Sequence, residues 1–307
     1  SSNLIDSSTP FFLQNPSLEV LDLSGNALES LPSQFFSNST AIKELYLAGN
    51  KLQDLSPGLG NLSLLEVLDA SNNSLSSLRA ELLEGKALLR KLYLANNAIS
   101  SVQDGALRSL IELRELELSS NVLLSLPVQL SSLYHLRSLR LSDNLVEDVT
   151  KYLLDKLPNL QRLHMSRNRL RRVQRYVFED MAALEALRLD GNSLAALQPL
   201  CFSRNPRLKS LRLQQNLISG IEDAFQETAG LTSLNLSRNF ISFADFAMFP
   251  SSLASLDLSE NRLASLTNIA SPSPKLSLSY LDVSRNNLSF LGSSHLPCKT
   301  IRHVNAS

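Results

Sequence analysis

The pattern L-x-x-L-x-L-x-x-N-x-L recurs twelve times along the chain, and it constrains the fold more than any other feature. Its first copy is "LEVLDLSGNAL", residues 18–28, and the asparagines of successive copies lie 22 to 25 residues apart. A unit this short cannot bury its own leucines, so the copies must stack and share one continuous core. The repeat therefore predicts a solenoid. The twelve asparagines are Asn26, Asn50, Asn73, Asn97, Asn121, Asn144, Asn168, Asn192, Asn216, Asn239, Asn261 and Asn286.

Each unit contains a short alternating segment, such as Leu21-Asp22-Leu23. This alternation predicts a strand with its leucines inward and the residue between them on the open face, and stacked units then form a parallel sheet. The asparagine follows where the chain must turn, and its amide can bind backbone groups that the turn leaves without partners. We expect a ladder of these amides, and an outer aromatic spine from phenylalanines that follow their asparagines by nine or ten residues: Phe36, Phe178, Phe202 and Phe225.

The repeat and the outer segments "NALESLPSQFFSN" and "NRLRRVQRYVFEDM" resemble the extracellular leucine-rich repeat family, in its typical 24-residue subclass. The resemblance implies an α/β solenoid, a horseshoe with a concave parallel β-sheet and a mostly irregular or short-helical convex side. We expect a single domain over residues 1–307, with twelve full repeats in residues 18–291. The final "IRHVNAS" resembles a truncated thirteenth repeat. Cysteine-rich caps typical of the subclass are absent from the sequence, so the chain is expected to be a fragment of a longer ectodomain.

Partner recognition must come from the variable residues between the leucines, and by resemblance the concave face binds partners. At the central position of each predicted strand, the residues change along the chain from acidic and aromatic to basic and then back to acidic. Four basic or titratable members, in consecutive repeats, are expected to span about 14 Å if strands lie about 4.8 Å apart. Whether this strip binds an acidic protein surface or a glycan, or is only a solvated face, stays open. The predicted partner-binding strip comprises Tyr46, Tyr93, Glu117, Arg137, Arg140, Arg162, His164, Arg188 and Arg212.

Six N-x-S/T sequons favour secretion, although coincidence in an intracellular protein is the alternative. A sugar on Asn235 would block the sheet at the tenth repeat, whereas Asn38 and Asn61 fall on the outer return. The candidate glycosylation sites are Asn38, Asn61, Asn72, Asn235, Asn287 and Asn305.

The two cysteines, Cys201 and Cys298, lie four repeats apart. At the strand spacing they would be about 19 Å apart, beyond the roughly 7 Å limit for linked alpha carbons, so we expect no disulfide between them. Cys201 is expected to be a free or half-buried thiol. Cys298 is a candidate for an intermolecular disulfide or one to a missing segment.

Composition excludes several classes of function. The 29 basic and 29 acidic residues cancel, which argues against binding nucleic acid or a membrane surface through a bulk field. No run approaches the roughly 20 apolar residues of a membrane span, and the first residues lack the pattern of a signal peptide. The sequence has no phosphate-binding glycine loop, H-E-x-x-H, C-x-x-C or G-x-S-x-G motif. We therefore expect no enzyme, cofactor or metal site.

By resemblance, the chain is most similar to Toll-type receptor ectodomains or secreted immune leucine-rich repeat proteins. The expected partner is a protein ligand or co-receptor, bound with or without homo- or heterodimerisation, at the cell surface or outside the cell. No nucleic acid is expected, and no membrane contact by this segment. Three alternatives stay open: a cell-adhesion or matrix protein, a membrane protein that tethers growth factors, and an intracellular scaffold.

Overall fold

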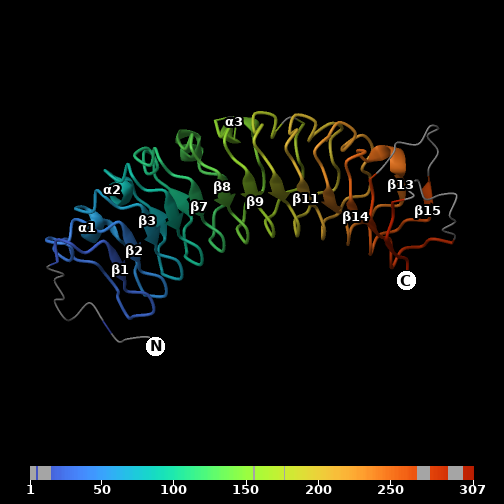
Figure 1. Cartoon of the computed structure of the whole chain (residues 1–307). Helices are drawn as coiled ribbons and strands as arrows, with labels where there is room; N and C mark the ends of the chain where they lie inside the picture. The colour runs from blue at the N-terminus through green and yellow to red at the C-terminus, as the bar shows by residue number, and fades with distance from the viewer. Residues whose placement is uncertain (1–4, 6–14, 155, 176, 268–276, 290–299) are drawn as a thin grey trace. The chain divides into compact units, whose positions relative to one another are not determined.

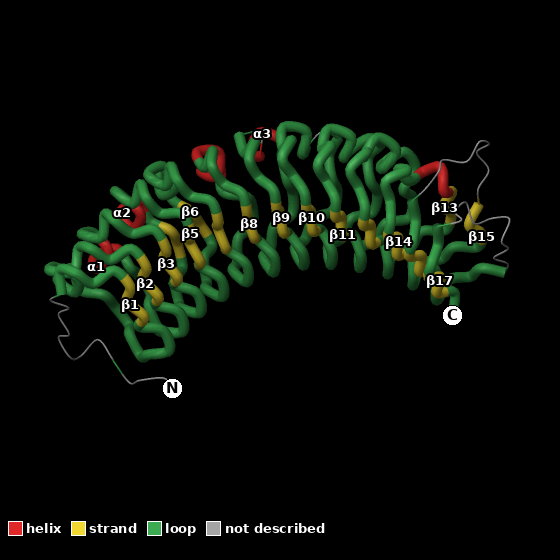
Figure 2. The backbone as a smooth tube through the Cα atoms, viewed as in Figure 1, coloured by secondary structure: helices red, strands yellow, loops and turns green. Residues whose placement is uncertain are grey.

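The computed structural model describes residue 5 and residues 15–154, 156–175, 177–267, 277–289 and 300–307. The chain forms two compact units, Ser1–Leu145 and Val146–Ser307. In each unit the strands of the main sheet lie along one side, and the short helices lie along the opposite side (Figures 1 and 2).

Parallel strands from successive repeats build the main sheet of the first unit. They are β1 (Val20–Asp22), β2 (Glu44–Tyr46), β3 (Val67–Asp69), β5 (Lys91–Tyr93), β7 (Glu115–Glu117) and β8 (Ser138–Arg140). A second, two-stranded sheet pairs β4 (Ser77–Leu78) with β6 (Ser101–Val102). The helices of this unit are α1 (Ser56–Leu59), α2 (Ala80–Leu83) and the 3-10 helix η1 (Val128–Ser132).

The second unit repeats this plan. Its main strands are β9 (Arg162–His164), β10 (Ala186–Arg188), β11 (Ser210–Arg212), β12 (Ser233–Asn235), β14 (Ser255–Asp257), β16 (Tyr280–Asp282) and β17 (His303–Asn305). Strand β13 (Phe243–Asp245) pairs with β15 (Ser265–Thr267), and the helices are α3 (Lys151–Leu154) and the 3-10 helix η2 (Phe246–Met248). Strand β17 lies in the segment predicted to be a thirteenth repeat, and its Val304 pairs with Leu281.

The predicted asparagine ladder is present within both units. Asn50 shows the geometry: its Nδ2 donates to the carbonyl oxygens of Leu47, in its own turn, and of Leu23, in the preceding repeat, at 2.9 and 3.0 Å. Its Oδ1 accepts the backbone N–H of Leu28 at 3.0 Å. Asn216 makes the same three bonds in the second unit. These amides satisfy buried backbone groups that no strand or helix can pair.

The residue before each ladder asparagine has a left-handed backbone conformation. Glycine, which adopts it without strain, fills this place at Gly25, Gly49 and Gly191. Elsewhere the place is taken by Asn72, Asn96, Ser120, Asp143, Arg167, Gln215, Arg238, Glu260 and Arg285, with φ between 52° and 58°. The turn geometry is thus imposed by the ladder and the stacked strands, since most of these side chains do not favour it.

Among the residues that the structure describes, the stacked aromatic spine forms in the second unit and not in the first. Phe178, Phe202 and Phe225 stack with ring centroids 6.2 and 6.1 Å apart, and Phe249 extends the stack by a further 6.2 Å. Phe249 was not predicted. Phe36, in the first unit, instead meets its neighbour Phe35 edge-on at 4.8 Å. Buried leucines occupy the corresponding places in the repeats that follow it, at Leu59, Leu83 and Leu107.

Helix α1 packs against the preceding repeat through a glycine. A methyl group on Gly58 would lie 2.5 Å from Cβ of Leu31, which is 1% exposed, and 3.0 Å from its carbonyl oxygen. Gly60, two residues later, would meet no atom within 4 Å and has an ordinary φ of −47°. The close approach of two repeats therefore depends on Gly58 and not on Gly60.

We expect Gly58→Ala to lower the free energy of unfolding by about 1–3 kcal/mol, because the added methyl overpacks a closed contact. Gly60→Ala is the matched control, and it should be neutral or stabilise by up to about 1 kcal/mol. Urea unfolding followed by circular dichroism checks both. Equal midpoints for the two variants would contradict the assigned contact.

Candidate functional site

The candidate site is the column of residues that end the main strands, here called the sheet-face column. Each member lies between two apolar residues at leucine positions of the repeat. Register places the members side by side within each unit, for example Asp22 beside Tyr46 and Arg188 beside Arg212. The first unit carries Asp22, Tyr46, Asp69, Tyr93, Glu117 and Arg140. The second carries His164, Arg188, Arg212, Asn235, Asp257, Asp282 and Asn305. The predicted basic stretch thus divides into Arg140 in the first unit and His164, Arg188 and Arg212 in the second.

Carboxylate and amide members of the column support the turn that follows each strand. The Oδ1 atom of Asp22 accepts the backbone N–H of Ser24 at 2.8 Å, and that of Asp69 accepts the N–H of Ser71 at 2.9 Å. Asn235, Asp257 and Asp282 bind both the N–H and the hydroxyl of the serine two residues later. The sequence signal for this role is the recurrent acid-x-Ser or Asn-x-Ser triplet, which the charge pattern of the column alone does not reveal.

Glu117, predicted to bind a partner, is engaged within the fold. Its Oε1 accepts the N–H of Ser119 at 2.9 Å, and its Oε2 lies 3.3 Å from Nη1 of Arg140. The Glu117 side chain is 14% exposed and that of Arg140 is 43% exposed. Arg140 therefore offers the accessible part of this pair.

The two tyrosines of the column use their hydroxyls to bind neighbouring glutamates. Tyr46 donates to Glu44 at 2.7 Å, and Tyr93 donates to Glu115 at 3.2 Å. The hydrogen bond to Glu44, followed by burial, raises the pKa of Tyr46. Burial, followed by the Glu115 charge, raises the pKa of Tyr93 to about 12. Both hydroxyls stay protonated at neutral pH, so the tyrosines present uncharged, half-buried rings to a partner.

The basic residues of the predicted strip have different exposures. Arg212 is exposed, whereas His164 and Arg188 are half-buried in the same sheet. Arg162 opens strand β9 and is exposed, and Arg137, just before β8 in the first unit, is exposed as well. Beside the column in the second unit, Lys209 Nζ pairs with Glu185 Oε2 at 3.3 Å.

The acidic end of the second unit is a closed hydrogen-bond network around Asp282, which is 9% exposed. Its Oδ1 accepts from Ser284, and its Oδ2 accepts from Asn305 Nδ2 at 3.0 Å and from the Tyr280 hydroxyl at 3.3 Å. Burial acts to raise the pKa of Asp282, but the hydrogen bonds, led by those from Ser284, outweigh it and lower the pKa. This carboxylate therefore stabilises the sheet and is not available to a ligand.

The sequons fall into two groups by exposure. Asn38, Asn61, Asn72 and Asn287 are exposed, while Asn235 and Asn305 are half-buried in strands. Asn235 donates from Nδ2 to Asp257 at 3.1 Å. Its neighbours in register are Arg212 and Asp257, so a sugar on Asn235 would cover that part of the sheet-face column.

Cys201 is a free thiol and is 2% exposed. Burial raises the pKa of Cys201 to about 12, which keeps the thiol protonated and unreactive at neutral pH. Its burial fits the expectation of a free or half-buried thiol. Cys298 lies outside the described residues, so its predicted disulfide stays a prediction.

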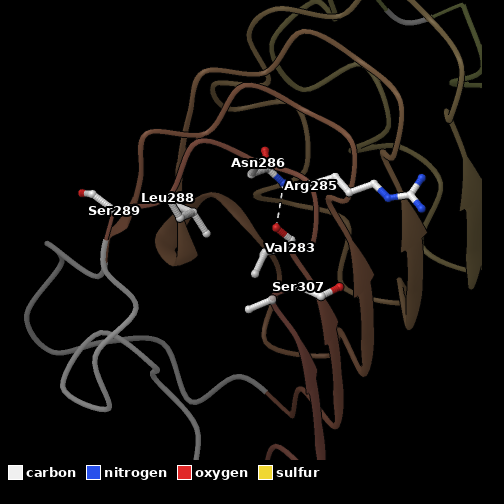
Figure 3. Close-up of a pocket in the computed structure, with 7 residues that line it drawn as sticks. Val283, Arg285, Asn286, Leu288, Ser289 and Ser307 are labelled. Atoms are coloured by element: carbon white, nitrogen blue, oxygen red, sulfur yellow. Dashed lines mark hydrogen bonds between the residues drawn. The ribbon is translucent and has the colours of Figure 1, made fainter.

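The hollows on the described surface are open to solvent rather than enclosed. One of about 270 Å³ lies beside Val283, Asn286, Leu288 and Ser307, where Asn286 Nδ2 donates to the Val283 carbonyl at 2.9 Å (Figure 3). Among the described residues, no group of three or more His, Cys, Asp or Glu side chains could hold a metal ion. These surfaces assemble no nucleophile and base of the kind that hydrolytic chemistry requires.

Comparison with known proteins supplies the decisive observation. A family model described as leucine rich repeat matches residues 1–52, 16–75, 40–99, 87–146, 134–194 and 184–241. The chain belongs to the leucine-rich repeat family. The predicted α/β solenoid with a parallel sheet is thereby confirmed, in both the sequence match and the strand order within each unit. A sequence search among curated proteins finds no match.

Three solved leucine-rich repeat structures are similar to this chain. A leucine-rich repeat protein of Leptospira interrogans is 26% identical, with TM-score 0.75, over 97% of this chain and 81% of that one. FLRT2, solved in a complex with Latrophilin 3 and Unc5D, is 26% identical, with TM-score 0.72, over 82% and 78%. Drosophila Toll, solved in complex with Spatzle, is 25% identical, with TM-score 0.72, over 88% of this chain and 41% of that one.

The family fold is a protein-interaction scaffold, and two of these relatives were solved in protein complexes. In the part of the chain that the structure describes, no helix is long and apolar enough to cross a membrane.

Because Asp282 has a lowered pKa, its contribution to stability is present above the ordinary value of 3.8 and is lost as pH falls through the lowered pKa. We expect Asp282→Ala to lower the free energy of unfolding at pH 7 by about 1–3 kcal/mol, since it leaves buried donors unpaired. The difference between wild type and variant should shrink on acidification. Urea unfolding between pH 2 and pH 7 measures this, with the exposed Glu227→Gln as the control. A difference that does not depend on pH would contradict the assigned role.

Proposed function

We propose that this chain is an extracellular recognition module of a receptor-type leucine-rich repeat protein, which binds a protein partner through the sheet-face column. The proposal rests on the different roles that the residues of this column have in the fold. Its acidic and amide members support turns, while the hydroxyls of Tyr46 and Tyr93 bind neighbouring glutamates and Arg140 pairs with Glu117. Arg212, in the second unit, is exposed. Tyrosine and arginine are the residues that most often dominate protein interfaces.

The first unit is the better candidate for the main contact. Tyr46 and Tyr93 supply large, rigid rings whose hydroxyls are already bound, so a partner can cover them without stranding a donor. Arg140 ends strand β8 of the same unit, and its side chain is 43% exposed. The second unit contributes a basic surface, from Arg162, His164, Arg188 and Arg212, suited to an acidic partner. Modification of Asn235 would restrict the use of that surface.

Similarity to Toll in complex with Spatzle and to FLRT2 in complex with Latrophilin 3 and Unc5D supports a protein ligand or co-receptor as the partner. We place the chain in the innate-immune, Toll-like group, in which the partner acts by complex formation or dimerisation, and we assign it no enzymatic activity. The adhesion protein, the growth-factor tether and the intracellular scaffold remain the competing functions. The experiments below distinguish the adhesion protein and the intracellular scaffold from the proposed receptor module.

A glycan wedge tests the binding face. Arg140→Asn creates the sequon N-L-S with Ser142 and would place a sugar on the sheet of the first unit, while Gln226→Asn creates N-E-T with Thr228 on the exposed outer return. We expect the sugar at position 140, once confirmed by mass, to abolish capture of the partner from extracellular fluid by the immobilised chain. The sugar at position 226 should leave capture unchanged.

Tyr93→Ala tests the same face without a sugar, and we expect it to weaken binding of the captured partner at least tenfold, equivalent to about 1.4 kcal/mol. Full capture by the glycosylated 140 variant would place the contact away from this sheet. Capture of a second copy of the chain alone would favour the adhesion reading.

The extracellular location is tested by the sugars themselves. On protein isolated from its own organism, we expect glycans on the exposed Asn38, Asn61, Asn72 and Asn287, because enzymes of the secretory pathway modify accessible sequons. Peptide mass mapping before and after enzymatic deglycosylation measures the occupancy of each site. Bare asparagines at all six sequons would reject secretion and favour the intracellular scaffold.

A further inference from the structure

The turn after strand β9 in the second unit contains an unusual density of arginine. Residues 167–175 read "RNRLRRVQR", and every arginine in this run is exposed. We call this segment the arginine turn; its position follows β9 in Figure 2. It lies beyond the end of the strand and is separate from the sheet-face column. Its members are Arg167, Arg169, Arg171, Arg172 and Arg175.

Backbone contacts fix how the arginine turn sits between its neighbours. The N–H of Arg169 donates to the carbonyl of Val146 at 2.9 Å on one side, and the carbonyl of Arg171 accepts from Ala195 at 3.4 Å on the other. Val173 forms a parallel bridge with Leu197. Arg171 and Arg172 are therefore flanked by Glu147 and Asp148 in the preceding repeat and by the small residues at positions 195 and 196 in the following one.

The preceding repeat compensates the charge of this turn only in part. Arg172 Nη2 lies 3.6 Å from Asp148 Oδ2, with the side chains 69% and 40% exposed. An ion pair this exposed is worth only about 0–1 kcal/mol and can be exchanged for an external anion. Arg169 and Arg171 make no ion pair with any residue that the structure describes. A hollow of about 350 Å³ lies over Glu147, Asp148, Arg171 and Arg172, so the guanidinium groups border open space.

The fold itself does not require this charge. The core of the seventh repeat is supplied by Leu163, Met165, Leu170 and Val173, all buried, and its ladder position by Asn168. At the places of Arg169, Arg171 and Arg172, the next repeat carries Ser193, Ala195 and Ala196. The same backbone path is therefore built without any basic side chain one repeat later, which leaves the arginines available for a ligand.

We propose that the arginine turn binds a sulfated polysaccharide chain. Sulfate groups present planar pairs of oxygen acceptors, which the guanidinium fork binds with two parallel hydrogen bonds, and arginine is more weakly hydrated than lysine. Arg169 and Arg172 are separated by at most about 10 Å of extended backbone, so several groups of one flexible polyanion can be bound together.

A sulfated polysaccharide fits better than a nucleic acid. Proteins that bind single strands combine a basic groove with aromatic rings on which the bases stack, and the arginine turn contains no aromatic residue. The chain as a whole has no net charge, so it lacks the broad positive field that draws proteins to duplexes. The site is a local one, and it does not rest on the function proposed for the sheet-face column.

The test compares two triple variants with the same change in net charge. The first is Arg169→Gln, Arg171→Gln and Arg172→Gln, and the second is Arg204→Gln, Arg207→Gln and Arg302→Gln, three arginines exposed elsewhere in the same unit. Heparin is the probe, in affinity chromatography and in titration calorimetry of the whole chain. Circular dichroism and thermal unfolding confirm that each variant is folded.

We expect the first variant to bind heparin at least tenfold more weakly at 0.15 M salt, and the control to bind within twofold of wild type. The magnitude of the slope of log affinity against log salt concentration should fall by about two to three. The reason is that heparin binding releases about one counterion fewer for each arginine that has been replaced. A third variant, with lysine at positions 169, 171 and 172, keeps the charge and loses the fork; it should lie between wild type and the glutamine variant.

Two results would overturn the proposal. Equal weakening of both glutamine variants would show that net charge alone governs retention. Equal affinity for heparin and for single-stranded DNA of matched charge, lost together in the first variant, would show a general polyanion site without preference for sulfated sugar.

Discussion

The side-chain amide of the ladder asparagine determines most of this architecture. In Asn50, one amide binds its own turn through Leu47 and the preceding repeat through Leu23 and Leu28. A buried backbone group left without a partner costs about 1–3 kcal/mol, so each amide that satisfies three such groups is hard to replace. The bonds also fix the offset between neighbouring repeats, and with it the parallel register that pairs Val20 with Glu44. Which side chains face the core and which face solvent follows from that register.

The repeat made the scaffold predictable to a fine level. The asparagine spacing located the main strands and the turns, and the structure has a further strand in the final "IRHVNAS", where Val304 pairs with Leu281. The aromatic spine was predicted only in part. Ring stacking needs phenylalanine in consecutive repeats, which holds for Phe178, Phe202 and Phe225 but not for Phe36, whose following repeats place leucine there. Phe249 also lies ten residues after its ladder asparagine, Asn239, so the same spacing that selected the other rings would have predicted it.

The candidate site was less predictable, because one position in the repeat serves two purposes. Asp22 and Asp69 occupy the same repeat position as the predicted binding residues Tyr46 and Tyr93, although both aspartates bind serine N–H groups in the next turn. The distinguishing signal was two residues away, in the serine. For Glu117 the serine accounts for only one of the two carboxylate oxygens, because the second oxygen pairs with Arg140. On this scaffold, binding residues can be identified only after the side chains that stabilise the turns have been excluded.

The ladder also gives the solenoid a direction. The Oδ1 atom of each asparagine accepts an N–H from the preceding repeat, as Asn216 does from Leu194, while its Nδ2 keeps a partner in its own turn through Leu213. If a repeat detaches, its predecessor is left with the backbone N–H and carbonyl that the detached asparagine bound. Its successor instead loses the N–H and the carbonyl that its own asparagine side chain bound. Opening is therefore not equivalent from the two sides of a break. Local unfolding within each unit should therefore spread more readily in one direction along the chain than in the other.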